Sequence, residues 1–214
     1  MNVPPLALLL ALVGLAWGFV SDRIASRWPA HEDASIRKID WRTPVVTILG
    51  GAAFAGLGIR FSDPIPLAIF ALDFAALTLL LATDLDQRLL PDLLTLPLAA
   101  GGLAVAVAGL NPLVPWAGLP WAIGVAIGIP LGLFLLSIPF GRGALAEGDL
   151  KLLLSVGIFA GLVRAFSGIL VGGLVAGLVV GLLLLTKRVG LRSYVPFGPF
   201  LIIGAFWSIL LRFS

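Results

Sequence analysis

Long apolar runs separated by short polar stretches fill most of this chain of 214 residues. The runs cover about residues 4–20, 44–58, 66–82, 93–110, 116–138, 150–186 and 195–211. They are continuous rather than alternating, which predicts helices that cross a membrane and not the strands of a barrel. The run at 150–186 is too long for one crossing of about 20 residues. It can turn only at 161–164, so we predict two helices there and about eight in all.

Composition supports an integral membrane protein. Hydrophobic residues make up 60% of the chain and charged residues 12%, about half the charged share of a soluble domain. Backbone N–H and C=O groups find no hydrogen-bond partner in lipid and must be paired within the protein. We therefore predict an all-α polytopic bundle, with residues 1–214 as one membrane domain. The first run follows no basic segment and precedes no small-residue cleavage site, so we interpret it as a retained helix. The polar residues 21–43 are predicted to form a short cytoplasmic loop.

The distribution of Lys and Arg predicts the orientation. With the N-terminus and the C-terminus outside, eleven basic residues fall on the inner side and three on the outer side, which fits the positive-inside rule. The inner ones are Arg23, Arg27, Arg37, Lys38, Arg42, Arg88, Arg142, Lys151, Lys187, Arg188 and Arg192; the outer ones are Arg60, Arg164 and Arg212. We therefore expect positive charge to serve orientation, and we expect no nucleic-acid partner.

Residue types limit the possible chemistry. The chain has no cysteine and one histidine, His31. Disulfides, cysteine nucleophiles and multi-histidine metal sites are therefore excluded, and we expect no metal and no cofactor.

Two acidic clusters lie at the edges of apolar runs. The first, residues 83–92, contains Asp84, Asp86 and Asp92, and the second, residues 146–151, contains Glu147 and Asp149. Two carboxylates held close together cannot both ionise easily, so one keeps its proton while the other acts as a base. Such a pair activates water for attack on a peptide carbonyl and then protonates the leaving amine. Our interpretation is that Asp84 and Asp149 meet as an aspartyl catalytic pair on the cytoplasmic side.

Simpler roles exist for the neighbouring charges. The spacing of Asp86 with Arg88, and of Glu147 with Lys151, is typical of exposed ion pairs, which contribute little to stability. Asp92 is placed as the N-cap of the following helix.

Asp73 lies in the middle of the apolar run at 66–82. An acid at that depth is costly and is a functional candidate that faces the bundle interior. It precedes Asp84 by three helical turns, so both share one helix face, with Asp73 about 16 Å deeper.

Small residues favour close helix packing near the C-terminal end of the chain. They are Gly168, Gly172, Gly173, Ala176, Gly177 and Gly181. This spacing predicts a tight helix contact.

Three motifs together resemble a known family. Residues 83–97 contain Asp-x-Asp, a short spacer, Leu-Pro-Asp and Leu-Thr-Leu-Pro; residues 148–153 are Gly-Asp-Leu-Lys-Leu-Leu; residues 195–200 are Val-Pro-Phe-Gly-Pro-Phe. In order and spacing they are similar to the prepilin peptidases, or type IV leader peptidases, which are aspartic membrane proteases of the GxGD type. The resemblance covers about residues 66–211, which we take as the peptidase core.

The resemblance implies a function and a set of site residues. Asp84 and Asp149 correspond to the catalytic pair. The residues that match the motifs in supporting or substrate-binding positions are Asp86, Asp92, Gly148, Lys151, Pro196 and Gly198, to which our own reasoning adds Asp73. The implied substrate is the basic leader of type IV prepilins or pseudopilins, cut just before their hydrophobic helix at the cytoplasmic face of the inner membrane.

The chain departs from the family pattern at two places. Ala146 stands where the first glycine of the GxGD pattern is usual. Longer members carry a cytoplasmic domain with four cysteines and also methylate the trimmed product; this chain has no cysteine, so N-methyltransferase activity is not expected. Two alternatives stay open: a small ion-coupled transporter with Asp73 as coupling acid, and a related protease or silent homologue with another substrate.

Overall fold

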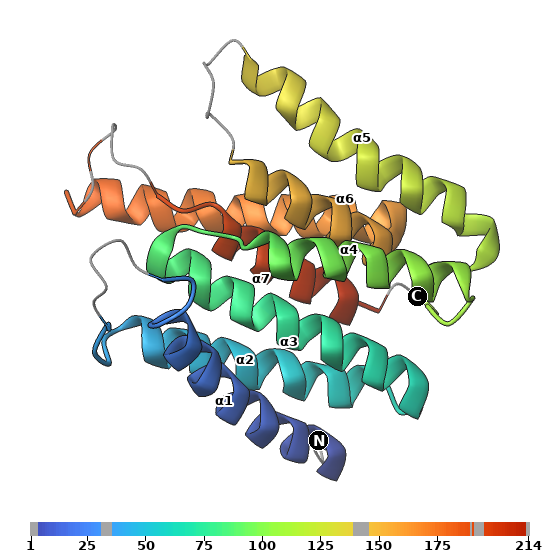
Figure 1. Ribbon diagram of the computed structural model, residues 1–214, viewed down its shortest axis with the longest axis horizontal. Helices are drawn as coiled ribbons and strands as arrows, with labels where there is room; N and C mark the ends of the chain where they lie inside the picture. The colour runs from blue at the N-terminus through green and yellow to red at the C-terminus, as the bar shows by residue number, and fades with distance from the viewer. Residues whose placement is uncertain (1–3, 31–35, 139–145, 189, 191–194, 213–214) are drawn as a thin grey trace.

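The protein is built from helices. A computed structural model describes residues 4–30, 36–138, 146–188, 190 and 195–212, and these contain no β-strand. The elements are α1 (Pro5–Ala25), α2 (Arg42–Arg60), α3 (Pro64–Gln87), α4 (Asp92–Val107), the 3-10 turn η1 (Trp116–Gly118), α5 (Leu119–Ser137), α6 (Glu147–Leu185) and α7 (Gly198–Leu210). They lie roughly side by side in one bundle (Figure 1). The predicted all-α class is confirmed.

Helix α6 reverses direction at Gly161. This residue has φ 73° and ψ 179°, which no α-helix contains. A methyl group at Gly198 would lie 3.3 Å from Asp149 Oδ1, and one at Gly172 would lie 2.6 Å from the carbonyl oxygen of Phe200. Residues 149 and 172 therefore both reach the start of α7, whereas a straight helix would separate them by about 34 Å. The two halves of α6, before and after Gly161, run antiparallel, and the turn falls at the first residue of the predicted stretch 161–164.

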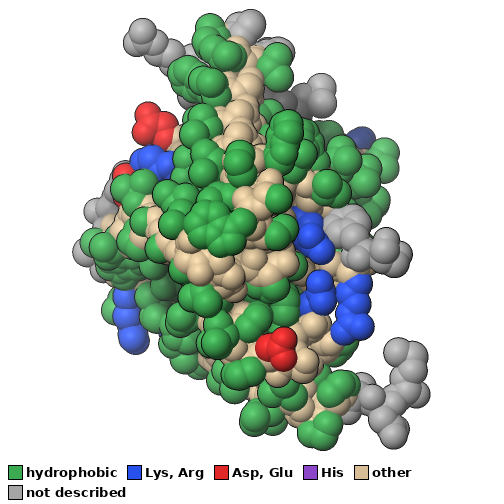
Figure 2. All heavy atoms as spheres, turned by 90° about the vertical axis from the view of Figure 1, so that its right-hand side faces the viewer, with side chains coloured by type: hydrophobic (Ala, Val, Ile, Leu, Met, Phe, Trp, Pro, Cys, Tyr) green, Lys and Arg blue, Asp and Glu red, His purple; other side chains and the backbone are tan. Residues whose placement is uncertain are grey.

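The helices suit a lipid environment. Five are long and apolar enough to span a membrane: α1, α2, α3, α5 together with η1, and α6. Large apolar side chains point outward, such as Leu72 at 74% exposure and Leu185 at 81%, which is costly in water and favourable in lipid. Hydrophobic side chains also dominate the face at the right-hand end of the bundle (Figure 2). The chain is a membrane protein, while the number of crossings and the outward placement of both termini stay predictions.

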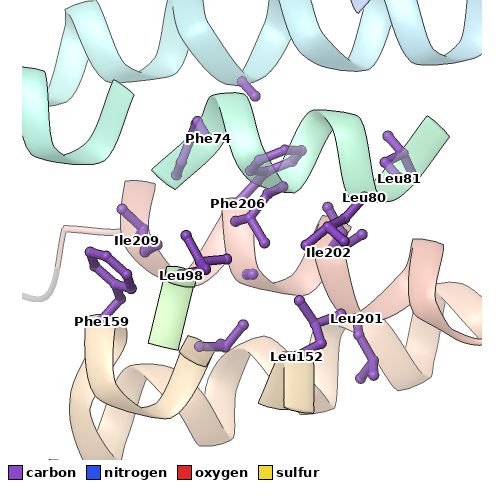
Figure 3. Packing of buried hydrophobic residues seen from close by; sticks show 14 of the residues in the cluster. Phe74, Leu80, Leu81, Leu98, Leu152, Phe159, Leu201, Ile202, Phe206 and Ile209 are labelled. Atoms are coloured by element: carbon purple, nitrogen blue, oxygen red, sulfur yellow. The ribbon is translucent and has the colours of Figure 1, made fainter. Parts of the chain in front are cut away.

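The main core lies between α3, α7 and the first half of α6. Phe74 and Leu80 of α3 point toward Phe206 and Ile202 of α7, and Leu152 packs beside them (Figure 3). The rings of Phe74 and Phe206 have centroids 4.6 Å apart. Since α3 ends at one acidic cluster and α6 begins at the other, this core holds the two clusters at one end of the bundle.

Glycines allow close contact between α6 and α7, as expected for small residues in a membrane. A methyl group at Gly168 would lie 2.8 Å from the carbonyl oxygen of Gly204. Gly173, Gly177 and Gly181 have open space there, with no described atom within 4 Å of an added methyl group. The predicted small-residue face is therefore used only in part.

The loop after the first helix is shorter than predicted. Helix α1 continues to Ala25 and α2 begins at Arg42, so residues 21–25 are helical rather than part of a loop at 21–43. The reason is that Asp22 is fully buried and satisfied by hydrogen bonds, which lets the helix continue past the apolar run. His31 lies outside the described residues.

Candidate active site

Asp84 and Asp149 come together where three helices meet. Asp84 lies in the last turn of α3 and Asp149 in the first turn of α6. Each is only 5% exposed. A methyl group at Gly198, the first residue of α7, would lie 2.6 Å from Asp84 Oδ2 and 3.3 Å from Asp149 Oδ1. The two oxygens are therefore at most about 6 Å apart, the sum of these distances.

Two glycines leave room for this arrangement. Any side chain at Gly198 would collide with the Asp84 carboxylate. A methyl group at Gly148, next to Asp149, would lie 2.9 Å from Leu90 Cβ. The motif glycines thus allow α7 and the segment after α3 to approach the two acids closely.

A cavity of about 500 Å³ opens beside the pair. Its lining comes from all three sequence motifs: Asp84, Arg88, Leu89, Leu90, Pro91, Asp92, Ala146, Glu147, Gly148, Asp149, Lys151, Pro196 and Phe197. Asp84 Oδ2 has no hydrogen-bond partner among the described residues. A polar ligand or water in the cavity could therefore bind it.

The electrostatics oppose full ionisation of the pair. Burial disfavours the charged form of each carboxyl group, and two negative charges this close repel each other. Arg88 supplies a positive charge near Asp84. Such surroundings favour a pair that shares one proton, which is the state that acid–base chemistry on water requires.

Lys151 connects the second acidic cluster to the start of α4. Its Nζ donates to both carboxylate oxygens of Asp92, at 2.7 and 2.8 Å. The predicted N-cap role of Asp92 is wrong. Pro91 occupies the N-cap position, where no side chain caps the helix, and Asp92 is the first residue of α4. The predicted pairing of Lys151 with Glu147 is replaced by this contact, because the fold brings the start of α4 beside the first turn of α6.

Asp86 differs from the exposed ion pair that its sequence suggested. Its side chain is 2% exposed and forms ion pairs with Arg37 Nε at 2.6 Å and Arg42 Nη1 at 3.2 Å. Residues 37–42 fold back over the end of α3, which removes Asp86 from solvent. It does not line the cavity beside the pair, and it lines a neighbouring cavity of about 810 Å³ instead.

Asp73 is buried in the bundle interior, as predicted for an acid in this run. It is 3% exposed, and its Oδ2 has no hydrogen-bond partner among the described residues. It does not line the cavity beside Asp84. Its role stays a prediction.

The sequence interpretation missed the contribution of Arg37 and Asp22. They form an ion pair with each other, and Arg37 also pairs with Asp86. The signal that could have found them is Asp22 itself, an acid directly after an apolar run in a chain with few charges. Within the described residues, no group of three or more His, Cys, Asp or Glu side chains is placed to hold a metal ion.

The fold and the cavity define a helical membrane protein with a pair of buried carboxyl groups at one end of its bundle. Comparison with known proteins identifies the group to which it belongs. Residues 71–185 match the family described as the type IV leader peptidase family. This match covers more than half of the chain, so the chain belongs to that family. No solved structure matches it.

Curated relatives carry the same printed name, prepilin leader peptidase/N-methyltransferase. The protein from Dickeya chrysanthemi is 30% identical over 178 residues, which are 81% of this chain and 61% of the relative. The protein from Burkholderia pseudomallei (strain 1026b) is 34% identical over 164 residues, 76% of this chain and 52% of the relative. The protein from Pseudomonas putida is 29% identical over 181 residues, 81% of this chain and 60% of the relative. The chain thus spans between half and two thirds of these relatives.

Proposed function

We propose that this protein is an aspartic endopeptidase that removes the leader peptide of type IV prepilins or pseudopilins. The observation that carries the proposal is the meeting of Asp84 and Asp149, buried and at most about 6 Å apart, in a member of the type IV leader peptidase family.

The two carboxyl groups divide the chemistry. The ionised member takes a proton from a water molecule in the cavity as that water attacks the scissile carbonyl carbon. The protonated member donates a hydrogen bond to the carbonyl oxygen, where negative charge develops. As the C–N bond breaks, a carboxyl group gives a proton to the leaving amine, and the pair returns to its singly protonated state.

The surroundings of the pair fit a substrate with a basic leader. Four acids and two basic residues line the cavity, which attracts a cationic peptide. Asp92 and Lys151 neutralise each other, and Arg88 offsets the single negative charge of a pair that shares one proton, so Glu147 leaves the cavity with a net negative charge. The positive-inside distribution of Lys and Arg supports a cytoplasmic position for this end of the bundle in the inner membrane.

A second cavity fits the hydrophobic helix that follows the leader. It has a volume of about 810 Å³ and shares Arg88 and Pro196 with the first cavity. Its walls are mainly apolar side chains of α2, α3, α6 and α7, among them Leu49, Leu81 and Phe200. A substrate that lies across both cavities would place the junction between its basic leader and its hydrophobic helix beside Asp84.

The direct test uses the purified protein in liposomes and a synthetic prepilin peptide that includes the leader. Asp84→Asn and Asp149→Asn should each slow cleavage by at least about 100-fold, because each removes a group needed for proton transfer. Asp63→Asn is the matched control, since Asp63 is an exposed acid at the other end of α3. Unchanged cleavage in either of the first two variants would refute the assignment.

We propose peptidase activity without N-methyltransferase activity, because the chain has no cysteine and a short loop between α1 and α2. Mass spectrometry of the trimmed peptide, after incubation with S-adenosylmethionine, should show an unmodified N-terminus. A mass increase of one methyl group would contradict this part of the proposal.

One observation favours a second candidate, a small ion-coupled transporter. Asp73 is buried within α3 with an unpartnered oxygen, as expected for a coupling acid. Uptake of an ion or solute by the same liposomes, without cleavage of the leader peptide, would favour this candidate. Cleavage of another membrane peptide but not of prepilin would indicate a related protease with a different substrate.

A further inference from the structure

A network of ion pairs around two buried acids joins the end of α3 to the end of α1 and to the segment before α2. Its members include Asp22 and Asp86, whose side chains are 1% and 2% exposed, and Arg37 at 12%. None of these residues lines the cavity beside Asp84. The network therefore has no part in the chemistry described above, although Asp86 lines the second, apolar cavity.

Arg37 is the centre of the network. Its Nη2 donates to Asp22 Oδ1, and its Nη1 donates to Asp40 Oδ1 at 2.7 Å. Its Nε lies 2.6 Å from Asp86 Oδ1, an ion-pair contact. One guanidinium group thus connects three carboxylates, which come from α1, from the segment before α2 and from α3.

The network acts on the turn of α3 that carries Asp84. Asp84 and Asp86 share the last turn, which the hydrogen bond from Arg88 N to Asp84 O closes at 2.9 Å. The helix ends there, because Arg88 has a left-handed conformation with φ 55°. Terminal helical turns fray readily when no other contact holds them.

A neighbouring contact secures the same turn from the loop. Gln87 Nε2 donates to the carbonyl oxygen of Pro29 at 2.7 Å. Arg42 Nη1 adds a second cation to Asp86, at 3.2 Å. Pro29, Arg37 and Arg42 therefore hold the last turn of α3 through Asp86 and Gln87.

Arg37 stays charged under all physiological conditions. Burial would lower its pKa, but the hydrogen bond to Asp22 and the negative charges of Asp22, Asp86 and Asp40 raise the pKa above its ordinary value. Removal of the guanidinium would leave Asp86 buried with one cation fewer, which favours movement of that turn toward water.

We propose that Arg37 is a positioning residue of the peptidase site: by its contact with Asp86 it fixes the last turn of α3, and so places the Asp84 carboxylate opposite Asp149. This inference rests on the proposed function for its catalytic consequence, and on the geometry alone for its mechanical part.

The test compares Arg37→Gln with Arg23→Gln in leader-peptide cleavage. Arg23 also pairs with Asp22, contacts Thr43 and donates to the backbone carbonyl of Arg37 at 3.2 Å. The cations that form ion pairs with Asp86 among the described residues are Arg37 and Arg42. Misplacement of a reacting group by about 1 Å costs up to about 100-fold, so kcat of Arg37→Gln should fall by about 10- to 100-fold. KM should change by less than about threefold, because Arg37 lines neither cavity, and Arg23→Gln should keep kcat within about threefold.

Two more readouts separate positioning from general loss of stability. The pH profile of kcat should shift in Arg37→Gln and not in Arg23→Gln, since the distance between two carboxyl groups sets how they share a proton. The losses of Arg37→Gln and Asp86→Asn should not multiply in the double variant, because both changes break the Arg37–Asp86 contact, although Asp86→Asn also weakens the contact with Arg42.

Hydrogen exchange of the peptide covering residues 84–88 tests the mechanical part without any substrate. Exchange should accelerate in Arg37→Gln and not in Arg23→Gln. Unchanged exchange and unchanged kcat in folded Arg37→Gln would overturn the inference, and so would equal losses in both variants.

Where Arg37→Gln does not fold, Arg37→Lys replaces it, since it keeps the charge but cannot reach three carboxylates, and the same results are expected. Absence of cleavage by the unmodified protein, with faster exchange in the Arg37 variant, would refute the proposed function alone.

Discussion

At the scale of single residues, the site depends on two glycines, which carry no side chain, as much as on the two acids. Gly198 faces both carboxylates, and Gly148 faces Leu90, each at a distance that leaves no room for a methyl group. The sequence placed these glycines in motifs but could not show what they touch. Only the packing of α7 against the end of α3 makes the requirement for glycine visible.

Gly198→Ala should reduce leader cleavage by about 10-fold or more, because its methyl group would lie 2.6 Å from Asp84 Oδ2 and displace that carboxylate. Gly173→Ala is the control, since it meets open space and removes a helix-destabilising glycine. Rates with the leader peptide and thermal unfolding of both variants check this. Full activity in Gly198→Ala would show that the pair tolerates displacement.

Also at this scale, the roles of Asp84 and Asp149 as a pair could be proposed from spacing and residue type, while the partners of Asp86 and Asp92 could not. The prediction of exposed ion pairs assumed that each acid pairs with a base a few positions away in the sequence. The structure pairs Asp92 with Lys151, 59 positions away, and Asp86 with Arg42, 44 positions away. Contacts of that range depend on how the helices assemble, which apolar periodicity does not encode.

At the scale of elements, the reversal inside α6 determines where Asp149 lies. The length of the apolar run and the need for a second crossing indicated the turn, and Gly161 provides it with φ 73°. Boundaries were less predictable: α1 continues through Asp22 because Thr43 and Arg37 bind its buried carboxylate. Apolar runs alone locate helices only to within a few residues.

Gly161→Ala should destabilise the protein by about 1–3 kcal/mol, because φ 73° with ψ 179° is a backbone conformation that is essentially restricted to glycine. The added methyl group would also lie 3.3 Å from Val114 Cγ2. Gly177→Ala, a helical glycine in open space, should be neutral or stabilising. Denaturant unfolding in detergent provides the comparison, and equal stability of the two variants would contradict the strain at Gly161.

At the scale of the whole molecule, the bundle separates its charges between its two ends. The acids of the candidate site, Arg88 and Lys151 lie at one end, and Arg212 contacts the carbonyl oxygen of Ile59 near the other. The all-helical class and the membrane setting followed from composition and run length. The side that faces the cytoplasm rests on charge counting and is open to direct measurement.

The lack of cysteine makes the orientation simple to test, because single cysteines can be introduced without background. Lys38→Cys, in the exposed segment before α2, should resist a membrane-impermeant thiol reagent in intact cells. Ser62→Cys, in the exposed connection between α2 and α3, should react. Lysis should make both reactive. The opposite pattern in intact cells would place the candidate site outside the cytoplasm.

The central claim is that Asp84 and Asp149 act as one catalytic unit, and the most direct measurement is the leader-cleavage rate of the double variant Asp84→Asn/Asp149→Asn beside the two single variants. Residues that act as a unit are non-additive, so the double variant should be about as slow as either single variant. Multiplied losses in the double variant, or substantial cleavage with either carboxyl group removed, would contradict the account.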